Sequence, residues 1–537
     1  MTRLSRLTAS LSLLLIGLTA LADQSTPAVA LPAKLPVCGL APAKLIPDLC
    51  LVKYRVSTSS PECQAYFDQG LGYFYSYVWM EAARSFETAA HYDPDCAMAY
   101  WGMSRALERW SKRAQSDQAL QKAKDKMASA SHREQLLITA RLQEKGMWPN
   151  VAEDARKKTA VKTINELLTL HDDDEEAWYY RAQLGDSSTH AIPDYKALLR
   201  INPVHPGANH ELVHLYENQK RPALGWPHAE NYIKSSPGIP HAFHMQAHLA
   251  MRLGRYDKTT ERSARAVELQ RAYHRVQNVK PSEDHQFSHH LETLLRSLVH
   301  DGRYVEARKL KEETWGYNYR HWLPWFHLHL AERNWPEAQK VIDHFRRTDK
   351  QTACYLAALL YLRQGNAERA SAEVEVLRQA MASGKGNKQL EHRLWESQGV
   401  LMCQTGSSEA GLKLIGKIVN NTMNDYAHHA WSNGAYYMET WGVAALKSGQ
   451  LETAEEAFLE ALAHEPSCAR AALGLQVLCE RQGRAEEAER YQALGRRCWK
   501  QADAGVLDRE LAFLREPYPV KEILHEPRER NTETSER

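Results

Sequence analysis

The chain has 537 residues, which is enough for several domains or for one long array of repeats. Its 68 lysines and arginines nearly balance its 66 aspartates and glutamates, and the formal charge is +2. With so little net charge and no cluster of basic residues, the sequence gives no reason to expect nucleic acid or an anionic membrane as a partner.

Residues 1–22 have the layout of a secretory signal peptide. Two arginines and no acid open the chain, an apolar run covers residues 11–21, and Ala20 and Ala22 form an A-x-A cleavage pattern before Asp23. The apolar run is too short to span a bilayer comfortably, and no longer one follows, so we expect no membrane span. The segment predicts export to the periplasm or the extracellular space.

Residues 23–55 are rich in proline and alanine, and we expect an extended leader there. Export allows disulfides. Cys38 and Cys50 can form a local loop within the leader, and Cys63 and Cys96 can link the first helical hairpin. The chain holds nine cysteines, so at least one thiol is left free or pairs with another molecule.

A recurring spacing predicts the fold. The same separations of 3, 9, 4, 3 and 5 residues occur in two sets: Gly70, Tyr73, Ala82, Phe86, Ala89 and Pro94, and Gly442, Ala445, Ala454, Phe458, Ala461 and Pro466. This spacing resembles the tetratricopeptide repeat, a helix–turn–helix unit of 34 residues. Small residues let the two helices approach closely, an aromatic ring fills the seam, and proline ends the second helix.

Further units are indicated by glycines between helices: Gly254, Gly302, Gly365, Gly406, Gly449 and Gly483. We therefore predict an all-α fold, a tetratricopeptide-like α-solenoid of stacked hairpins in a right-handed superhelix. We expect roughly nine or ten hairpins across residues 60–500, with degenerate ones around 130–200. We divide them into amino-terminal hairpins (56–200), histidine-rich hairpins (201–345) and carboxy-terminal hairpins (346–505). The charged extension 506–537 is expected to be largely disordered.

The stretch HELVH at residues 210–214 matches H-E-x-x-H, the zinc-binding signature of many metalloproteases. It lies on the predicted first helix of one unit, and the next unit begins with HAFHMQAHLAMRLGRY at residue 241. His210 and His244 are 34 residues apart, as are His214 and His248. Two successive first helices thus carry an H-x-x-x-H pair at the same height.

At about 100° per residue, these pairs lie off the packing seam, on the face that lines the concave groove of such arrays. Imidazoles from neighbouring helices can then converge on one metal ion. In the third unit, His289 is in register with His241, Glu292 with His244 and Arg296 with His248. The candidate metal ligands are His210, His214, Glu217, His241, His244, His248 and His289.

The stretches HPGANHELVHLYE and PGIPHAFHMQAHLAMRLGRY resemble motifs of a group of exported bacterial tetratricopeptide proteins. The resemblance covers the amino-terminal two-thirds of the chain and implies the fold and a possible metal, without a reaction. In that group the residue after the first histidine is usually aromatic. Glu211 departs from this pattern, which makes a protease less favoured.

Three hypotheses follow. The leading one is an exported repeat scaffold that binds a protein or peptide in its concave groove, with a histidine cluster for a divalent transition metal. Histidine and glutamate ligands suit zinc, all-histidine sites also suit copper, and nickel stays open. The second is a metal-dependent hydrolase with Glu211 or Glu217 as base, and His210, His214 and either His244 or His248 as ligands. The third is a structural assembly protein without metal, whose histidines bond to one another and to water. We favour binding over catalysis, and the sequence leaves the oligomeric state open.

Overall fold

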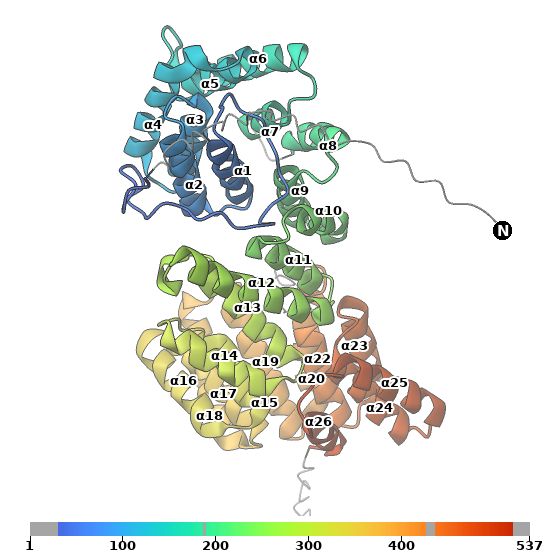
Figure 1. Cartoon of the computed structure of the whole chain (residues 1–537). Helices are drawn as coiled ribbons and strands as arrows, with labels where there is room; N and C mark the ends of the chain where they lie inside the picture. The colour runs from blue at the N-terminus through green and yellow to red at the C-terminus, as the bar shows by residue number, and fades with distance from the viewer. Residues whose placement is uncertain (1–29, 186–188, 426–434, 519–537) are drawn as a thin grey trace, which may run out of the picture.

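The computed structural model of the chain describes residues 30–185, 189–425 and 435–518. The predicted signal peptide and the end of the charged extension lie outside these residues. Every extended regular element within them is a helix, which confirms the all-α prediction (Figure 1). None of these helices has both the length and the apolar character needed to cross a bilayer.

Within the described residues, twelve pairs of consecutive helices stack along the chain. The first six pairs are α1 (Pro61–Tyr75) with α2 (Trp79–Tyr92), α3 (Ala97–Arg109) with α4 (Arg113–Lys126), α5 (His132–Glu144) with α6 (Arg156–Leu170), α7 (Glu175–Leu184) with α8 (Ala191–Ile201), α9 (Pro206–Asn218) with α10 (Pro222–Ser235), and α11 (Pro240–Arg252) with α12 (Tyr256–Gln277). The others are α13 (Phe287–His300) with α14 (Tyr304–Gly316), α15 (Trp322–Glu332) with α16 (Trp335–Thr348), α17 (Lys350–Arg363) with α18 (Ala367–Ala380), α19 (Lys388–Gln404) with α20 (Ser408–Thr422), α22 (Tyr436–Lys447) with α23 (Leu451–His464), and α24 (Ala469–Arg481) with α25 (Ala485–Cys498).

The small-residue and aromatic positions of the repeat pack as the spacing predicts. A Cβ atom added at Gly70 would lie 2.7 Å from the ring of Phe86, and one added at Gly442 would lie 2.6 Å from the ring of Phe458. Both rings are fully buried. Glycine is therefore required for the helices to approach this closely around the ring.

The six turn glycines named above all have positive φ angles, between 65° and 97°. At other turns the left-handed position holds a residue with a side chain: Tyr77, Ser111, Lys220 and Arg333 have φ near 60°. Such turns carry no glycine signal, and this is one reason why the sequence predicted fewer hairpins than the twelve observed. The right-handed winding stays a prediction.

The buried apolar residues form two clusters that meet within α12. The first extends from Ala43 to Ala266, and the second from Val267 to Leu514. In Figure 1 the helices of the first cluster lie above those of the second. The stack continues without interruption past residues 200 and 345, where the sequence suggested boundaries between groups of hairpins, because α8 packs on α9 and α16 packs on α17.

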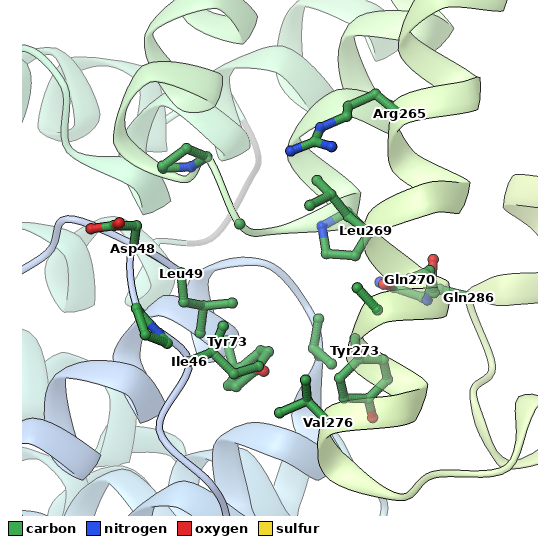
Figure 2. A pocket seen from close by; sticks show the side chains of 16 residues that line it. Ile46, Asp48, Leu49, Tyr73, Arg265, Leu269, Gln270, Tyr273, Val276 and Gln286 are labelled. Carbon is green, nitrogen blue, oxygen red and sulfur yellow. The ribbon is translucent and has the colours of Figure 1, made fainter.

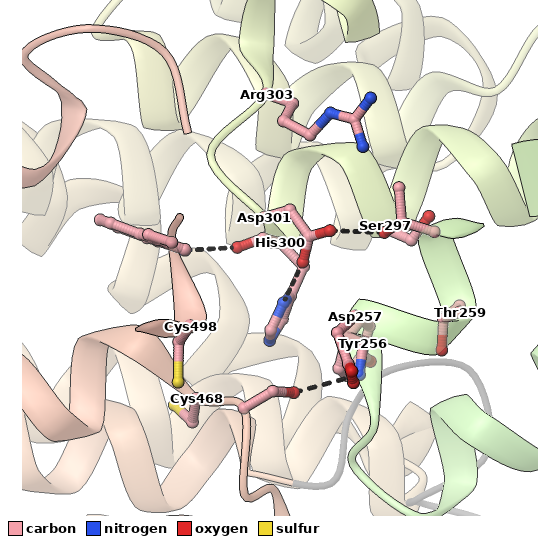
Figure 3. A network of polar contacts seen from close by, with 12 residues as sticks. Tyr256, Asp257, Thr259, Ser297, His300, Asp301, Arg303, Cys468 and Cys498 are labelled. Atoms are coloured by element: carbon pink, nitrogen blue, oxygen red, sulfur yellow. Dashed lines mark hydrogen bonds and ion pairs between the residues drawn. The ribbon is translucent and has the colours of Figure 1, made fainter. Parts of the chain in front are cut away.

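The last hairpins return to the turns that flank α12 and α13 (Figure 3). The Ser467 hydroxyl donates to the Gly254 carbonyl (2.6 Å), and the Trp499 indole donates to the His300 carbonyl (2.8 Å). The imidazole of His300 contacts Glu465 and Asp301. Burial alone would lower the pKa of His300, but these carboxylates raise it to about 10. The lower half of the array is thus closed on itself by a charged histidine.

The leader from residue 30 to 59 contains no helix or strand, but it is held in place. The Glu87 carboxylate accepts from the main-chain amides of Val37 and Cys38 at 2.6 and 2.7 Å. The amide of Leu51 donates to the Ser235 carbonyl at 2.7 Å. The leader therefore follows the surface formed by α2 and α10.

Two expectations about the ends and the cysteines need correction. Residues Val506–Arg515 form helix α26, so this part of the extension is not disordered. All nine cysteines are free thiols. Cys38 contacts Glu87 and the thiol of Cys50 lies 3.5 Å from the Ser236 hydroxyl, so these two meet different helices. The thiols of Cys63 and Cys96 do contact each other, and this contact lowers the pKa of Cys63.

Candidate metal centre

Six of the candidate histidines lie on three successive first helices. α9 carries His210 and His214, α11 carries His241, His244 and His248, and α13 carries His289. A proline at the first turn begins both α9 and α11, which fixes where each helix starts. Histidines four residues apart then share one helical face.

The structure divides these histidines into two triads. In the first triad, ring nitrogens of His210, His214 and His241 all lie within 4.8 Å of one another. Nε2 of His241 is 3.1 Å from Nε2 of His210. Nδ1 of His210 donates to the Tyr75 carbonyl at 2.6 Å, so this hydrogen bond places the proton on Nδ1 and leaves the Nε2 lone pair facing the triad.

The second triad repeats the first along the chain. Its members are His244, His248 and His289, and one ring nitrogen of each lies within 4.8 Å of the other two. Nε2 of His248 is 3.2 Å from Nε2 of His289. His244 and His248 follow the first pair by 34 residues. The two triads are therefore one arrangement used twice, in place of the single convergence point that we expected from the sequence.

Glu217 lies between the triads and contacts both. One carboxylate oxygen is 3.6 Å from Nδ1 of His214, and the other is 3.4 Å from Nδ1 of His248. Nε of Arg252 donates to the same carboxylate at 2.5 Å. Since Nε2 of His248 faces His289, Glu217 meets the outer nitrogens of these rings. The sequence suggested Glu217 as a ligand, whereas this geometry suits a carboxylate that orients the ligands.

The triads are buried, which corrects the expectation of an open groove. The exposed fraction is 0% for His210, 1% for His244 and 8% for His241. Burial, with the charges of neighbouring histidines, lowers the pKa of all three well below the ordinary value, and burial lowers that of His289 to about 4. The imidazoles are therefore neutral at neutral pH, which is the form that binds metal ions.

Glu217 is anionic in the same surroundings. Burial raises its pKa, but hydrogen bonds from His214 and His248 and the charges of His248 and Arg252 lower it far more. The centre thus combines neutral nitrogen donors with one fixed negative charge.

Several buried ring nitrogens have no hydrogen-bond partner among the described residues. They are Nε2 of His214, Nδ1 of His241, Nδ1 of His244 and Nε2 of His290. Buried polar atoms are nearly always paired, so such a group of orphaned acceptors and donors needs an explanation. A bound cation that takes up the lone pairs explains them, and the residues present fit a transition metal.

Two neighbours of the triads were not expected from the sequence. The ring of Tyr77, from the α1–α2 turn, stacks on His214 with centroids 5.5 Å apart and lies 4.5 Å from the ring of His210. His290 lies 4.0 Å from His244, ring to ring, and its Nδ1 is 2.5 Å from Oε1 of Gln270. The pair of adjacent histidines was a signal for His290, but nothing near HELVH points to a residue 133 positions earlier.

Glu211, the acid of HELVH, is not part of either triad. The Tyr179 hydroxyl donates to its carboxylate at 3.2 Å, and burial raises its pKa. A carboxyl group in this state can exchange protons near neutral pH. That property keeps the hydrolase hypothesis open.

The third unit shows what happens when the histidines are replaced. Glu292 and Arg296 occupy the positions of the H-x-x-x-H pair and form an ion pair at 2.9 Å. Nδ1 of His321 is 3.7 Å from the Glu292 carboxylate. The array therefore contains two triads followed by an ion pair at the next equivalent position.

A cavity of about 320 Å³ lies behind the second triad (Figure 2). The leader residues Ile46–Leu49 form one wall, and Tyr73 and α12 residues such as Tyr273 form others. Gln270 lines this cavity and also contacts His290. It is mostly apolar, and its amide is the direct link to the histidines.

Comparison with known proteins concerns the other end of the chain. Residues 440–502, which include α23 and α24, match the tetratricopeptide repeat family. The protein carries tetratricopeptide repeats. No curated protein matches the chain.

Solved structures with matching helical repeats include yeast Tom70, with 13% identity and a TM-score of 0.31 over 84% of this chain and 94% of that one. The P58(IPK) TPR domain matches with 12% identity and a TM-score of 0.22, over 82% of this chain and 99% of the other. The Naa15/Naa10 complex bound to HypK-THB matches with 13% identity and a TM-score of 0.28, over 83% of this chain and 65% of that one. These overlaps are loose, and no function is transferred from them.

Proposed function

We propose that this is an exported helical-repeat binding protein whose two histidine triads each hold a divalent transition-metal ion. The observation that carries the proposal is the repetition of the triad. The same three histidine positions converge twice, both times with neutral, buried imidazoles. A chance cluster of histidines gives no reason for a second copy in register.

Zinc and copper are the metals that suit the site best. Imidazole donors bind zinc, copper and nickel, and three nitrogens leave one coordination position for water or another ligand. Glu217 accepts from the outer nitrogens of one histidine of each triad, which holds those rings in the orientation that a metal requires.

The repeats supply the second half of the function. Tetratricopeptide repeats are a protein-interaction scaffold, so the match at residues 440–502 indicates a protein partner. Within the proposal, metal binding and partner binding occupy different parts of the chain, because the triads lie between residues 210 and 289.

Metal analysis of protein purified without an affinity tag tests the proposal. We expect two equivalents of metal in the unaltered protein, and one in each of the double variants His210→Ala/His214→Ala and His244→Ala/His248→Ala. His132→Ala is the matched control, since His132 is exposed at the start of α5. Absence of metal from the unaltered protein, or its retention in both double variants, contradicts the proposal.

Hydrolysis is the second candidate, because a carboxyl with a raised pKa lies near an open tri-histidine site. A panel of peptide, ester and phosphoester substrates separates the two. The binding proposal expects metal without turnover. Turnover that Glu211→Gln abolishes, with the metal retained, favours the hydrolase.

A further inference from the structure

The carboxy-terminal segment 506–518 lies on the inner face of the tetratricopeptide hairpins. Helix α26 packs against α22 and α24, which are the first helices of the last two hairpins. First helices line the concave side of such arrays, which is where partners bind. α26 therefore occupies the surface that a partner needs (Figure 1).

The contacts of α26 are those of an amphipathic helix in a groove. It buries Val506, Glu510, Leu511 and Leu514, at spacings of four, one and three residues, and exposes its opposite face. At ten residues it is too short to be a stable helix alone, so its helical state depends on the groove.

Glu510 is the one acid on the buried face of α26, and two arginines hold it. Nε of Arg470 on α24 donates to its carboxylate at 2.6 Å, and Arg363 on α17 lies 3.3 Å from the other oxygen. The Arg363 guanidinium also covers the ring of Phe513 at 3.5 Å. Three first helices therefore contribute to the binding of this segment, once Lys447 of α22 is included.

Lys447 shows that the groove has more positive charge than α26 neutralises. Its ammonium group donates to the main-chain carbonyls of Phe513 and Glu516, at 2.7 and 2.5 Å. Only 4% of this residue is exposed, and burial lowers its pKa to about 8. Carbonyl oxygens compensate a buried cation less well than a carboxylate does, so a more acidic helix would fit this groove better.

The closure of the array does not depend on α26. Trp499 and Asp503, which bond to His300 and Gly302, both precede the segment in the chain. Gly505 follows them with a left-handed φ of 75°, directly before the helix begins. The segment can therefore leave the groove while the ring stays shut.

We propose that the groove formed by α17, α22 and α24 binds an acidic amphipathic helix of a partner protein, and that residues 506–518 occupy this groove until the partner displaces them. The inference rests on the partner-binding part of the proposed function. Its test needs no metal, so its failure is distinct from failure of the metal proposal.

The experiment uses the full chain with a protease recognition sequence inserted between Ala504 and Gly505, which are both exposed. The protein folds first and is cleaved afterwards. The probe is a fluorescent synthetic peptide of residues 504–518, followed by fluorescence anisotropy. We expect the cleaved chain to exchange its segment for the probe, and the uncleaved chain to bind the probe at least about tenfold more weakly, because its tethered segment competes at high effective concentration.

Matched variants test the chemistry of recognition. A peptide with Glu510→Gln should bind at least about tenfold more weakly, because it loses the charge that Arg470 and Arg363 meet. A peptide with Asp508→Asn is the control, because Asp508 is exposed. Binding should also weaken as salt is raised. No exchange into the cleaved chain, or equal affinity for the Glu510→Gln and unaltered peptides, overturns the inference.

Discussion

The two triads have the same donors but different surroundings. The first is held by α9 and α11, both within the amino-terminal core, and is covered by Tyr77. The second joins α11 to α13, whose apolar residues belong to the carboxy-terminal core. A metal in the first triad therefore ties together helices that already share a core, whereas a metal in the second links the two cores. The difference teaches that one duplicated motif can serve two mechanical roles.

The largest effect is expected when the second triad is converted into the ion pair of the third unit. The double variant His244→Glu/His248→Arg copies Glu292 and Arg296 and removes two of three donors. We expect affinity at the second site to fall by about a thousandfold or more, with the first site unchanged. Competition titrations with a chelator measure both affinities. Equal losses at both sites would show that the triads are not separate.

The metal-free protein should lose stability in acid. Buried histidines have lowered pKa values in the folded state, about 4 for His289 and about 3 for His290, so between these values and about 6.5 only the unfolded chain binds their protons. Stability is therefore full above pH 6.5 and decreases as the pH falls. We expect a loss of roughly a few kcal/mol between pH 7 and pH 5, measured by urea unfolding. The His244→Ala/His248→Ala variant should show a shallower pH dependence, and an unchanged one would contradict the assignment.

Glu217→Gln tests whether the two triads share one orienting carboxylate. The amide cannot supply the negative charge that faces Nδ1 of His214 and His248. We expect metal affinity to fall about 10- to 100-fold at both sites, as is usual for such partners of metal-bound histidines. Isothermal titration checks this, with Glu268→Gln on the exposed face of α12 as control. An effect confined to one site would place Glu217 with that triad alone.

The smallest effect should distinguish the covers of the two sites. Tyr77→Phe keeps the ring over His214 and His210, and Tyr77→Ala removes it. We expect the alanine variant to release metal from the first site several-fold faster, by roughly 1 kcal/mol of lost contact. Release from the second site should not change. Stopped-flow transfer to a coloured chelator measures the rates, and acceleration at the second site instead would reverse the assignment of the cover.

Much of this arrangement could be read from the sequence, and particular residues show why. The spacing of Gly70 and Phe86 fixes a hairpin locally, and the 34-residue offset between His210 and His244 places two histidine pairs at one height. These are short-range regularities. Tyr77 could not be found in this way, since its contact with His214 depends on how α1 packs on α9.

The role of Glu217 illustrates a second limit. Helical geometry correctly places it near the histidines, but which nitrogen it meets depends on the ring orientations, which the Tyr75 carbonyl and Arg252 help to set. The burial of the triads also arises from distant segments, because the α1–α2 turn covers what would otherwise be an open groove. Likewise, the charged composition after residue 506 hid the apolar face of α26, which only the groove makes visible.

The contacts that join Gly254 to Ser467 and His300 to Trp499 have a consequence for how this protein can evolve. Open arrays lengthen or shorten by whole hairpins, because each unit touches only its neighbours. Here an added or deleted hairpin between residues 254 and 499 would move the two surfaces out of register and break the charged closure around His300. The number of repeats in the lower half is therefore set by geometry, and variation between relatives should be concentrated in loops rather than in whole units.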